Sequence, residues 1–196
     1  MLPYRVAGLL LVVALIAGAA SLPTVHAWDR AITVWLQQAA PAPDGPAAGL
    51  VFLGNAEVMI PAAMLVAIAL LFRDPRRGRR AASVAVGLGV VSALAFGLKY
   101  LIPHPGPPLS LQRPVFLAGL GIPQPYSFPS GHTMRTTFLA GVVLRGRPFF
   151  AGALILAMMA GLVYLGDHWT SDVLGGLCLG WACVEAARSV TGRLGL

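Results

Sequence analysis

The chain is organised around one polar stretch, Phe128-Pro129-Ser130-Gly131-His132-Thr133-Met134-Arg135. We predict that this stretch opens an otherwise apolar helix, with Ser130 as the N-cap. The free backbone amides of a helix start bind anions, and Gly131 allows a ligand to approach closely. His132 and Arg135 are three residues apart, so they would share one helix face and reach the same anion. An ordinary capped helix that happens to contain a histidine is the alternative interpretation.

The composition is that of an integral membrane protein. Hydrophobic residues make up 57% of the 196 residues and charged residues only 11%, with a mean hydropathy of +0.77. We therefore expect one all-α membrane domain over residues 1–196. The net charge of +7 reflects topology rather than a nucleic-acid partner, since ten of the fourteen Lys and Arg residues lie near span ends on one predicted side. Cys178 and Cys183 are expected to be core residues, in neither a disulfide nor a metal site.

The first 48 residues are predicted to hold one span and one surface helix. Residues 6–22 form a run of seventeen apolar or small residues, which suits a short retained span. A cleaved signal peptide over residues 1–27 is the alternative, because Val25-His26-Ala27 resembles a cleavage site. Residues 28–40 carry one apolar stripe with polar residues elsewhere, a pattern typical of an interfacial helix.

Arginine-rich turns fix the predicted orientation. Five arginines fall within residues 73–80, and Arg145 and Arg147 mark a second basic turn. Under the positive-inside rule both turns are cytoplasmic, as are both chain ends, while the loop of residues 103–129 lies outside. We predict a multi-pass protein of the cell (inner) membrane, a bundle with six helical spans at residues 6–22, 49–72, 81–102, 130–144, 148–166 and 170–187. The outer face would then hold Lys99, Arg113, His132, His168 and Asp172.

The pair His168 and Asp172 carries the predicted chemistry. Four residues separate them, so the carboxylate would lie one helical turn from the imidazole. A carboxylate bound to one ring nitrogen fixes the tautomer and leaves the other nitrogen free to attack. His132 adds a candidate proton donor, while Lys99 either snorkels to the membrane boundary or joins the anion site. A hydrated loop followed by a capped helix is the alternative interpretation of the pair.

Together these segments resemble the type 2 phosphatidic acid phosphatase family, six-span lipid phosphatases related to soluble vanadium haloperoxidases. The resemblance covers about residues 50–190 and rests on Pro129-Ser130-Gly131-His132 and on His168-Trp169-Thr170-Ser171-Asp172 followed by Val173-Leu174-Gly175-Gly176. It implies a metal-independent phosphatase without a cofactor. It also implies that His168 is the nucleophile, Asp172 its orienting partner and His132 the acid that protonates the leaving oxygen. The phosphoryl oxygens would be held by Ser130, Gly131 and Lys99.

Two arginines of the family pattern are absent from their expected positions. The first motif would place one seven residues after Lys99, where the chain has Gly106. The third motif would place the other six residues before His168, where the chain has Leu162. Loss of one donor to a developing oxyanion costs about 2.7–4 kcal/mol in other enzymes, so two uncompensated losses would lower activity by about four orders of magnitude or more. Either other cations replace these arginines or the activity is lost.

Arg113 and Arg135 are the candidate replacements. Arg113 lies seven residues beyond Gly106 in the outer loop, which could return it to the site. Arg135 lies one turn into an apolar helix on the His132 face, where an unpaired cation is costly and marks a functional site. An ion pair with Glu57 in the second span is the alternative interpretation of Arg135.

The sequence thus predicts a phosphatase that acts at the extracytoplasmic face of the membrane. Its substrate would be a phosphate monoester or diphosphate of a phospholipid or polyprenyl lipid, hydrolysed through a phosphohistidine. The alternative is a degenerate family member that binds or moves a phosphorylated lipid. A transporter is disfavoured, because the centres of the predicted spans are apolar apart from Glu57 and Arg135.

Overall fold

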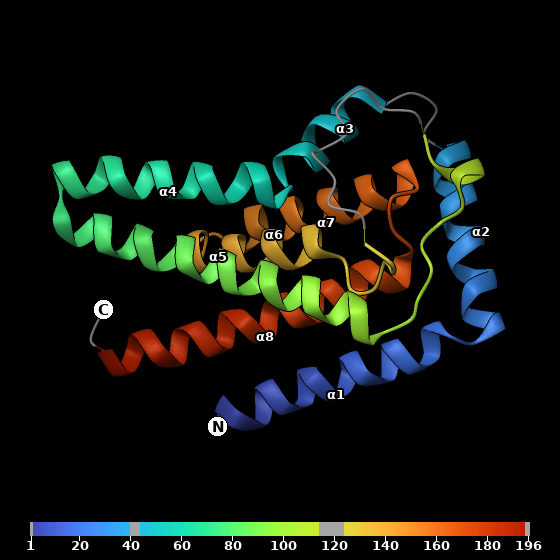
Figure 1. The fold of residues 1–196 in the computed structure, drawn as a ribbon, viewed down its shortest axis with the longest axis horizontal. Helices are drawn as coiled ribbons and strands as arrows, with labels where there is room; N and C mark the ends of the chain where they lie inside the picture. The colour runs from blue at the N-terminus through green and yellow to red at the C-terminus, as the bar shows by residue number, and fades with distance from the viewer. Residues whose placement is uncertain (1, 40–43, 114–123, 195–196) are drawn as a thin grey trace.

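The computed structural model describes residues 2–39, 44–113 and 124–194, which form helices joined by turns and loops (Figure 1). Within these ranges there is no strand, which confirms the all-α prediction. The helices are α1 (Leu2–Ala20), α2 (Pro23–Ala39), α3 (Asp44–Leu53), α4 (Ala56–Arg73), α5 (Pro75–Leu101), the 3-10 helix η1 (Leu109–Leu111), α6 (Gly131–Val143), α7 (Pro148–Leu165) and α8 (Thr170–Leu194).

Helices α1 and α2 form a bent pair that turns by 92° between Ala20 and Pro23. α1 packs against α8, while α2 packs against α7 and α8 (Figure 1). Asp29 on α2 is buried, and its carboxylate accepts hydrogen bonds from Ser171 N at 2.9 Å and Ser171 Oγ at 2.7 Å. These bonds tie the predicted interfacial helix to the first turn of α8.

The predicted second span is divided, which corrects the expectation of one helix over residues 49–72. Helix α3 ends at Leu53 and α4 starts at Ala56. Gly54 at the break is buried, and a Cβ there would lie 2.7 Å from Met158 Cε and 3.1 Å from His132 Cδ2. Glycine therefore lets the backbone pass close to α6 and α7.

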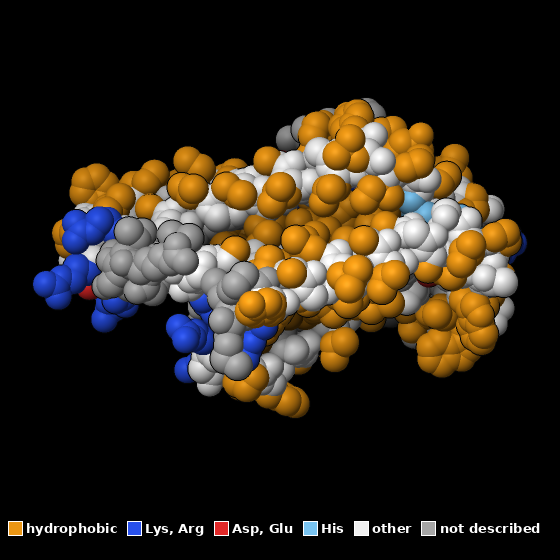
Figure 2. All heavy atoms as spheres, turned by 90° about the horizontal axis from the view of Figure 1, so that it is seen from below, with side chains coloured by type: hydrophobic (Ala, Val, Ile, Leu, Met, Phe, Trp, Pro, Cys, Tyr) orange, Lys and Arg blue, Asp and Glu red, His pale blue; other side chains and the backbone are white. Residues whose placement is uncertain are grey.

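Arginines gather where α4 turns into α5. Asp74 caps α5, because its Oδ1 accepts hydrogen bonds from the backbone N of Arg76 at 3.0 Å and Arg77 at 3.3 Å. Pro75 is the first residue of α5, so the helix starts six residues before the predicted span and includes most of these arginines. Figure 2 shows Lys and Arg side chains concentrated at one end of the molecule, while hydrophobic side chains cover most of the remaining face.

Helix α6 lies inside the bundle and packs against α5, α7 and α8. Glycines of α8 allow the closest approach: a Cβ at Gly176 would lie 2.6 Å from Ser130 O, and one at Gly180 would lie 2.8 Å from Met134 O. Phe128, just before α6, is fully buried in the adjoining core. The starts of α6 and α8 are therefore held side by side.

Three described helices, α4, α5 and α7, are long and apolar enough to cross a membrane, and the bent pair α1 and α2 would add a fourth crossing. Helix α6 has 13 residues, fewer than the roughly 20 that a full crossing needs. The membrane class is supported, whereas six spans stay a prediction. The starts of α4, α6 and α8 and the end of α5 all lie away from the arginine-rich turn, while α2 forms the opposite end of the molecule (Figure 1).

Candidate active site

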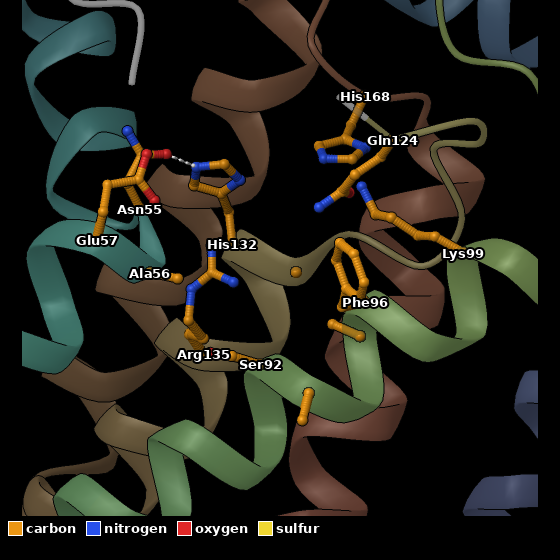
Figure 3. Close-up of a pocket in the computed structure, with 13 residues that line it drawn as sticks. Asn55, Ala56, Glu57, Ser92, Phe96, Lys99, Gln124, His132, Arg135 and His168 are labelled. Atoms are coloured by element: carbon orange, nitrogen blue, oxygen red, sulfur yellow. Dashed lines mark hydrogen bonds between the residues drawn. The ribbon is translucent and has the colours of Figure 1, made fainter. Parts of the chain in front are cut away.

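A cavity of about 440 Å³ lies where α4, α5, α6 and the turn before α8 meet (Figure 3). Figure 3 shows Lys99, Arg135 and His168 directed toward the same space. The predicted site residues that line it are Lys99, Gly131, His132, Arg135 and His168. Ser130 and Asp172 lie directly behind this lining: Ser130 precedes Gly131 in the chain, and Asp172 is hydrogen-bonded to His168. The structure thus gathers seven of the eight predicted site residues, and Arg113 lies elsewhere.

The start of α6 has the predicted capped geometry. Ser130 is the N-cap, with φ −67° and ψ 112°, and its Oγ accepts a hydrogen bond from Thr133 N at 3.4 Å. Ser130 N donates to Asp172 O at 3.0 Å, which fixes the cap against α8. A Cβ at Gly131 would lie 3.0 Å from Arg135 Nη1, so glycine leaves room for the guanidinium at the helix start. Backbone donors of this first turn thus form part of the cavity wall.

His168 and Asp172 form the pair that their spacing predicts. His168 Nδ1 donates to Asp172 Oδ2 at 3.3 Å, and Trp169 N donates to the same oxygen at 2.9 Å. Asp172 is fully buried and His168 is 5% exposed. Burial lowers the pKa of His168, although its hydrogen bond to Asp172 acts in the opposite direction. The imidazole is therefore neutral at pH 7, with Nδ1 protonated and Nε2 free to act as a nucleophile.

His132 lies close to His168, with ring centroids 6.2 Å apart. Its Nε2 donates to Asn55 Oδ1 at 2.6 Å (Figure 3). Asn55 directly precedes α4, so the break in the predicted second span supplies the group that orients this imidazole. The two histidines are thus held differently: a carboxylate supports His168, which favours a nucleophile, and a neutral amide supports His132.

Lys99 and Arg135 are buried cations beside the histidines, 8% and 7% exposed. Arg135 Nε donates to Gly54 O at 2.9 Å, an atom freed by the break between α3 and α4. Among the described residues, no carboxylate lies within 4.0 Å of either cation. The alternative ion pair of Arg135 with Glu57 is therefore not formed, although Glu57 lines the same cavity. Two buried cations with no carboxylate at ion-pair distance among the described residues favour an anionic ligand.

Arg113 does not line this cavity, which corrects the expectation that the outer loop returns it to the site. Its Nη1 donates to Asp44 Oδ1 at 3.0 Å and its Nη2 to Gln37 O at 3.0 Å. The guanidinium carbon also lies 4.4 Å from the centre of the Tyr164 ring. These contacts satisfy the charge of Arg113 and hold its loop against α2, α3 and α7. Of the two candidate replacement arginines, only Arg135 lines the cavity with the histidines.

The positions of the two missing arginines have ordinary surroundings. A Cβ at Gly106 would lie 3.3 Å from Ser127 Cβ, and Leu162 is fully buried in an apolar cluster with Val51 and Met158. Neither Gly106 nor Leu162 lines the cavity. Over the described part of the chain, no group of three or more His, Cys, Asp and Glu side chains is arranged to hold a metal ion.

Three polar residues of this region were not predicted as site residues from the sequence. Asn55 and Gln124 line the cavity, and His104 Nδ1 donates to Asp172 Oδ1 at 3.0 Å. Gly54-Asn55 is a turn dipeptide inside an apolar run, and this signal could have revealed the helix break. No local signal pairs His104 with Asp172, because 68 residues separate them.

Comparison with known proteins assigns the family. The model of the PAP2 superfamily matches residues 80–195, which include both cavity histidines, Asp172 and both buried cations. The chain belongs to the PAP2 superfamily. It is 33% identical over 133 residues to the decaprenylphosphoryl-5-phosphoribose phosphatase of Mycobacterium tuberculosis, in strains CDC 1551 / Oshkosh and H37Rv. That match covers 66% of this chain and 70% of the relative.

A solved PAP2 structure shares the fold. The crystal structure of a transmembrane PAP2-type phosphatidylglycerolphosphate phosphatase from Bacillus subtilis matches with a TM-score of 0.79 and 23% sequence identity, over 97% of this chain and 98% of that chain. The resemblance to the type 2 phosphatidic acid phosphatase family is therefore confirmed, and the chain is a PAP2-family membrane protein. The family match starts at residue 80, so Asn55 and Glu57 lie outside the matched part.

Proposed function

We propose that this PAP2 protein hydrolyses a lipid phosphate monoester or diphosphate through a phosphohistidine on His168. The observation that carries the proposal is the convergence of four groups on one cavity: a carboxylate-supported imidazole, a second imidazole and two buried cations. The M. tuberculosis relative is a decaprenylphosphoryl-5-phosphoribose phosphatase, which favours a phosphorylated polyprenyl lipid as the substrate.

The proposed reaction has two steps. First, His168 Nε2 attacks phosphorus, and the bond between phosphorus and the lipid oxygen breaks. Asp172 keeps the hydrogen bond from His168 Nδ1 and stabilises the positive ring that forms. The bound phosphate anion favours the protonated form of His132, which gives its Nε2 proton to the leaving oxygen in place of Asn55. Water then attacks phosphorus, His132 takes the proton of that water, and the bond between phosphorus and His168 breaks to release inorganic phosphate.

Lys99, Arg135 and the backbone of Ser130 and Gly131 at the start of α6 would hold the phosphoryl oxygens. Fixed cations in a buried site stabilise the charge that is spread over these oxygens in the transition state. The terminal nitrogens of Arg135 can grip two oxygens, whereas the ammonium of Lys99 acts as a point charge. Arg135 would thus take over the task of the arginines that the family pattern places elsewhere.

A second cavity, of about 590 Å³, could hold the lipid chain. Its lining is almost entirely apolar and runs from the end of α3 past Gly54 and along α4 to Leu70, with side chains of α5, α6 and α7 on the other sides. It adjoins the first cavity because Gly54, whose carbonyl binds Arg135, and Thr136, the next residue after Arg135, both line it. A phosphate at Arg135 would therefore leave its lipid chain at the entrance to an apolar channel.

Phosphate release from a lipid panel tests the proposed function. The purified protein, with a chelator present, is supplied with polyprenyl phosphates, polyprenyl diphosphates, phosphatidic acid and a short-chain soluble phosphate. We expect release from long-chain lipids to exceed release from the soluble phosphate and to be unaffected by the chelator. The His168→Ala protein, prepared in parallel, controls for contaminating phosphatases. Failure of folded wild-type protein to release phosphate from every lipid would contradict the proposal.

We further propose that the cavity opens at the extracytoplasmic face, with both termini in the cytoplasm. The support is that the arginine-rich start of α5 lies far from the starts of α6 and α8 (Figure 1), where the cavity residues Gly131 and His168 are found. Arg145 and Arg147, in the turn between α6 and α7, add a second basic segment. Basic turns of this kind stay in the cytoplasm.

Cysteine labelling in intact cells tests this orientation. In a background where alanine replaces Cys178 and Cys183, cysteine is introduced at Leu109, which is 83% exposed, or at Gly146, where an added side chain meets no other atom within 4 Å. An impermeant thiol reagent should modify the Leu109→Cys protein and leave the Gly146→Cys protein unmodified until the cells are permeabilised. The reverse labelling pattern would show that the cavity opens toward the cytoplasm and would contradict the proposed orientation.

Binding without hydrolysis is the second candidate function. It is favoured by Gly106 and Leu162, which occupy the positions of two family arginines. Such a protein would bind a lipid phosphate with an affinity that depends on Lys99 and Arg135 and would release no phosphate. Equilibrium binding of the same lipid panel, measured beside the release assay, distinguishes the two functions.

A further inference from the structure

Asp172 has two imidazole partners. Its Oδ2 accepts from His168 Nδ1 at 3.3 Å, and its Oδ1 accepts from His104 Nδ1 at 3.0 Å. Both side chains of the His104–Asp172 pair are withdrawn from solvent, with 3% and 0% of their surface exposed. A buried carboxylate is stable only when its oxygens are hydrogen-bonded. His104 supplies the donor for Oδ1, the oxygen that His168 does not contact.

The ring of His104 is held in place from several sides. Ser127 N and Ser127 Oγ donate to His104 O at 2.8 and 3.0 Å, which fixes the backbone beside Phe128. The His26 ring stacks on the His104 ring at 5.1 Å between centroids, with 8° between the planes, and the Phe128 ring packs edge-on at 6.2 Å. The imidazole is therefore presented to Asp172 in one orientation.

The electrostatic surroundings favour a charged His104. Burial is the largest single contribution and would lower its pKa, but the hydrogen bond and charge of Asp172 act against it, and the pKa of His104 is raised overall. The charge of Asp29 on α2 and the backbone of Ala20 act in the same direction. Within the described ranges, the titratable groups that act on or stack against this ring are Asp172 on α8 and His26 and Asp29 on α2. A positive His104 would weaken the attraction between the Asp172 carboxylate and His168.

We propose that His104 is a positioning residue for the proposed reaction: it fixes the second oxygen of Asp172 and thereby sets the orientation and basicity of His168. His104 would act through Asp172 and would not touch the substrate. Because the inference rests on the proposed function, it also needs a measurement that does not depend on turnover.

Two complementary substitutions separate the hydrogen bond from the ring. His104→Phe keeps an aromatic ring between His26 and Phe128 but removes the donor. His104→Asn removes the ring but places an amide N–H near the position of Nδ1. If His104 positions Asp172, the properties of His168 should be retained in His104→Asn and changed in His104→Phe. If His104 is only structural, they should be retained in His104→Phe and changed in His104→Asn.

Nitrogen-15 NMR of histidine-labelled protein reports the titration and tautomer of His168 without any substrate, and the chain has only 4 histidines to assign. In His104→Phe we expect the pKa of His168 to rise, because Asp172 loses the partner that shares its charge. In His104→Asn the titration should lie nearer that of the wild type. A wild-type titration of His168 in His104→Phe, or a larger change in His104→Asn than in His104→Phe, would overturn the inference. If His104→Phe does not fold, a wild-type His168 tautomer in His104→Asn supports the inference and a changed one overturns it.

Steady-state turnover of the lipid phosphate by the two His104 variants is the second test. His104→Phe should lower kcat about 10- to 100-fold with KM changed less than about twofold, the range expected for loss of one hydrogen bond to a buried charge. His104→Asn should recover most of kcat. Equal loss in both variants, in step with their melting temperatures, would show a structural role and overturn the inference. Absence of wild-type turnover would refute the proposed function, and the NMR titration would still decide the role of His104.

Discussion

Replacing His168 with alanine is expected to lower phosphate release by at least about 10⁴-fold, the scale on which other enzymes respond to loss of a covalent nucleophile. The buried cations and the start of α6 would remain, so the variant should still bind the lipid phosphate. Its melting temperature should fall only moderately, because Trp169 N still donates to the Asp172 oxygen that His168 Nδ1 contacts in the wild type. Release at the wild-type rate from folded His168→Ala protein would remove His168 from the reaction.

His132→Ala is the matched control, because it removes a second imidazole from the same cavity. Acid assistance is worth about 10²- to 10⁴-fold and matters less when the leaving oxygen is already a weak base. We therefore expect His132→Ala to retain a larger fraction of its turnover on an aryl phosphate than on an alkyl lipid phosphate. Equal loss on both substrates would contradict the different roles assigned to His132 and His168.

Arg135→Gln is expected to lower turnover by about 10²- to 10³-fold, as for loss of one donor to a developing oxyanion. Arg135→Lys should lose somewhat less, because an ammonium keeps the charge but cannot grip two oxygens. The hydrogen bond from Arg135 Nε to Gly54 O would be lost in Arg135→Gln, so a small fall in melting temperature is also expected.

Glu57→Gln distinguishes a phosphate clamp from a structural ion pair. Glu57 lines the cavity without reaching ion-pair distance of Arg135, so Glu57→Gln should leave the melting temperature nearly unchanged. An ion pair would give the opposite pattern: the Glu57→Gln, Arg135→Gln double variant would regain stability and activity relative to Arg135→Gln. Full activity of the Arg135→Gln protein would contradict the proposal that Arg135 holds the phosphoryl oxygens.

Local spacing was enough to predict much of the site. Ser130 as an N-cap, and His168 with Asp172 four residues later, depend only on helix geometry, and the structure reproduces both. The burial of Arg135 followed from the apolar residues around it in the helix. Such features can be read from sequence because the interacting groups lie within one or two helical turns of each other.

Long-range features could not be predicted in the same way. Arg113 was expected in the cavity because the outer loop is long, but Asp44, 69 residues away, binds its guanidinium instead. The helix break at Gly54 depends on the close approach of α6 and α7, and His104 meets Asp172 only after the bundle has formed. In each case the deciding partner comes from a distant part of the chain, which periodicity and spacing do not reveal.

Trapping the phosphoenzyme tests the central claim most directly. Wild-type protein is mixed with a lipid carrying radiolabelled phosphate, quenched in alkali, which preserves a bond between phosphorus and nitrogen, and mapped by peptide. We predict acid-labile label on the peptide that contains His168 and none in His168→Ala. Rapid turnover with label on another residue, or with the same label in His168→Ala, would contradict a reaction through His168.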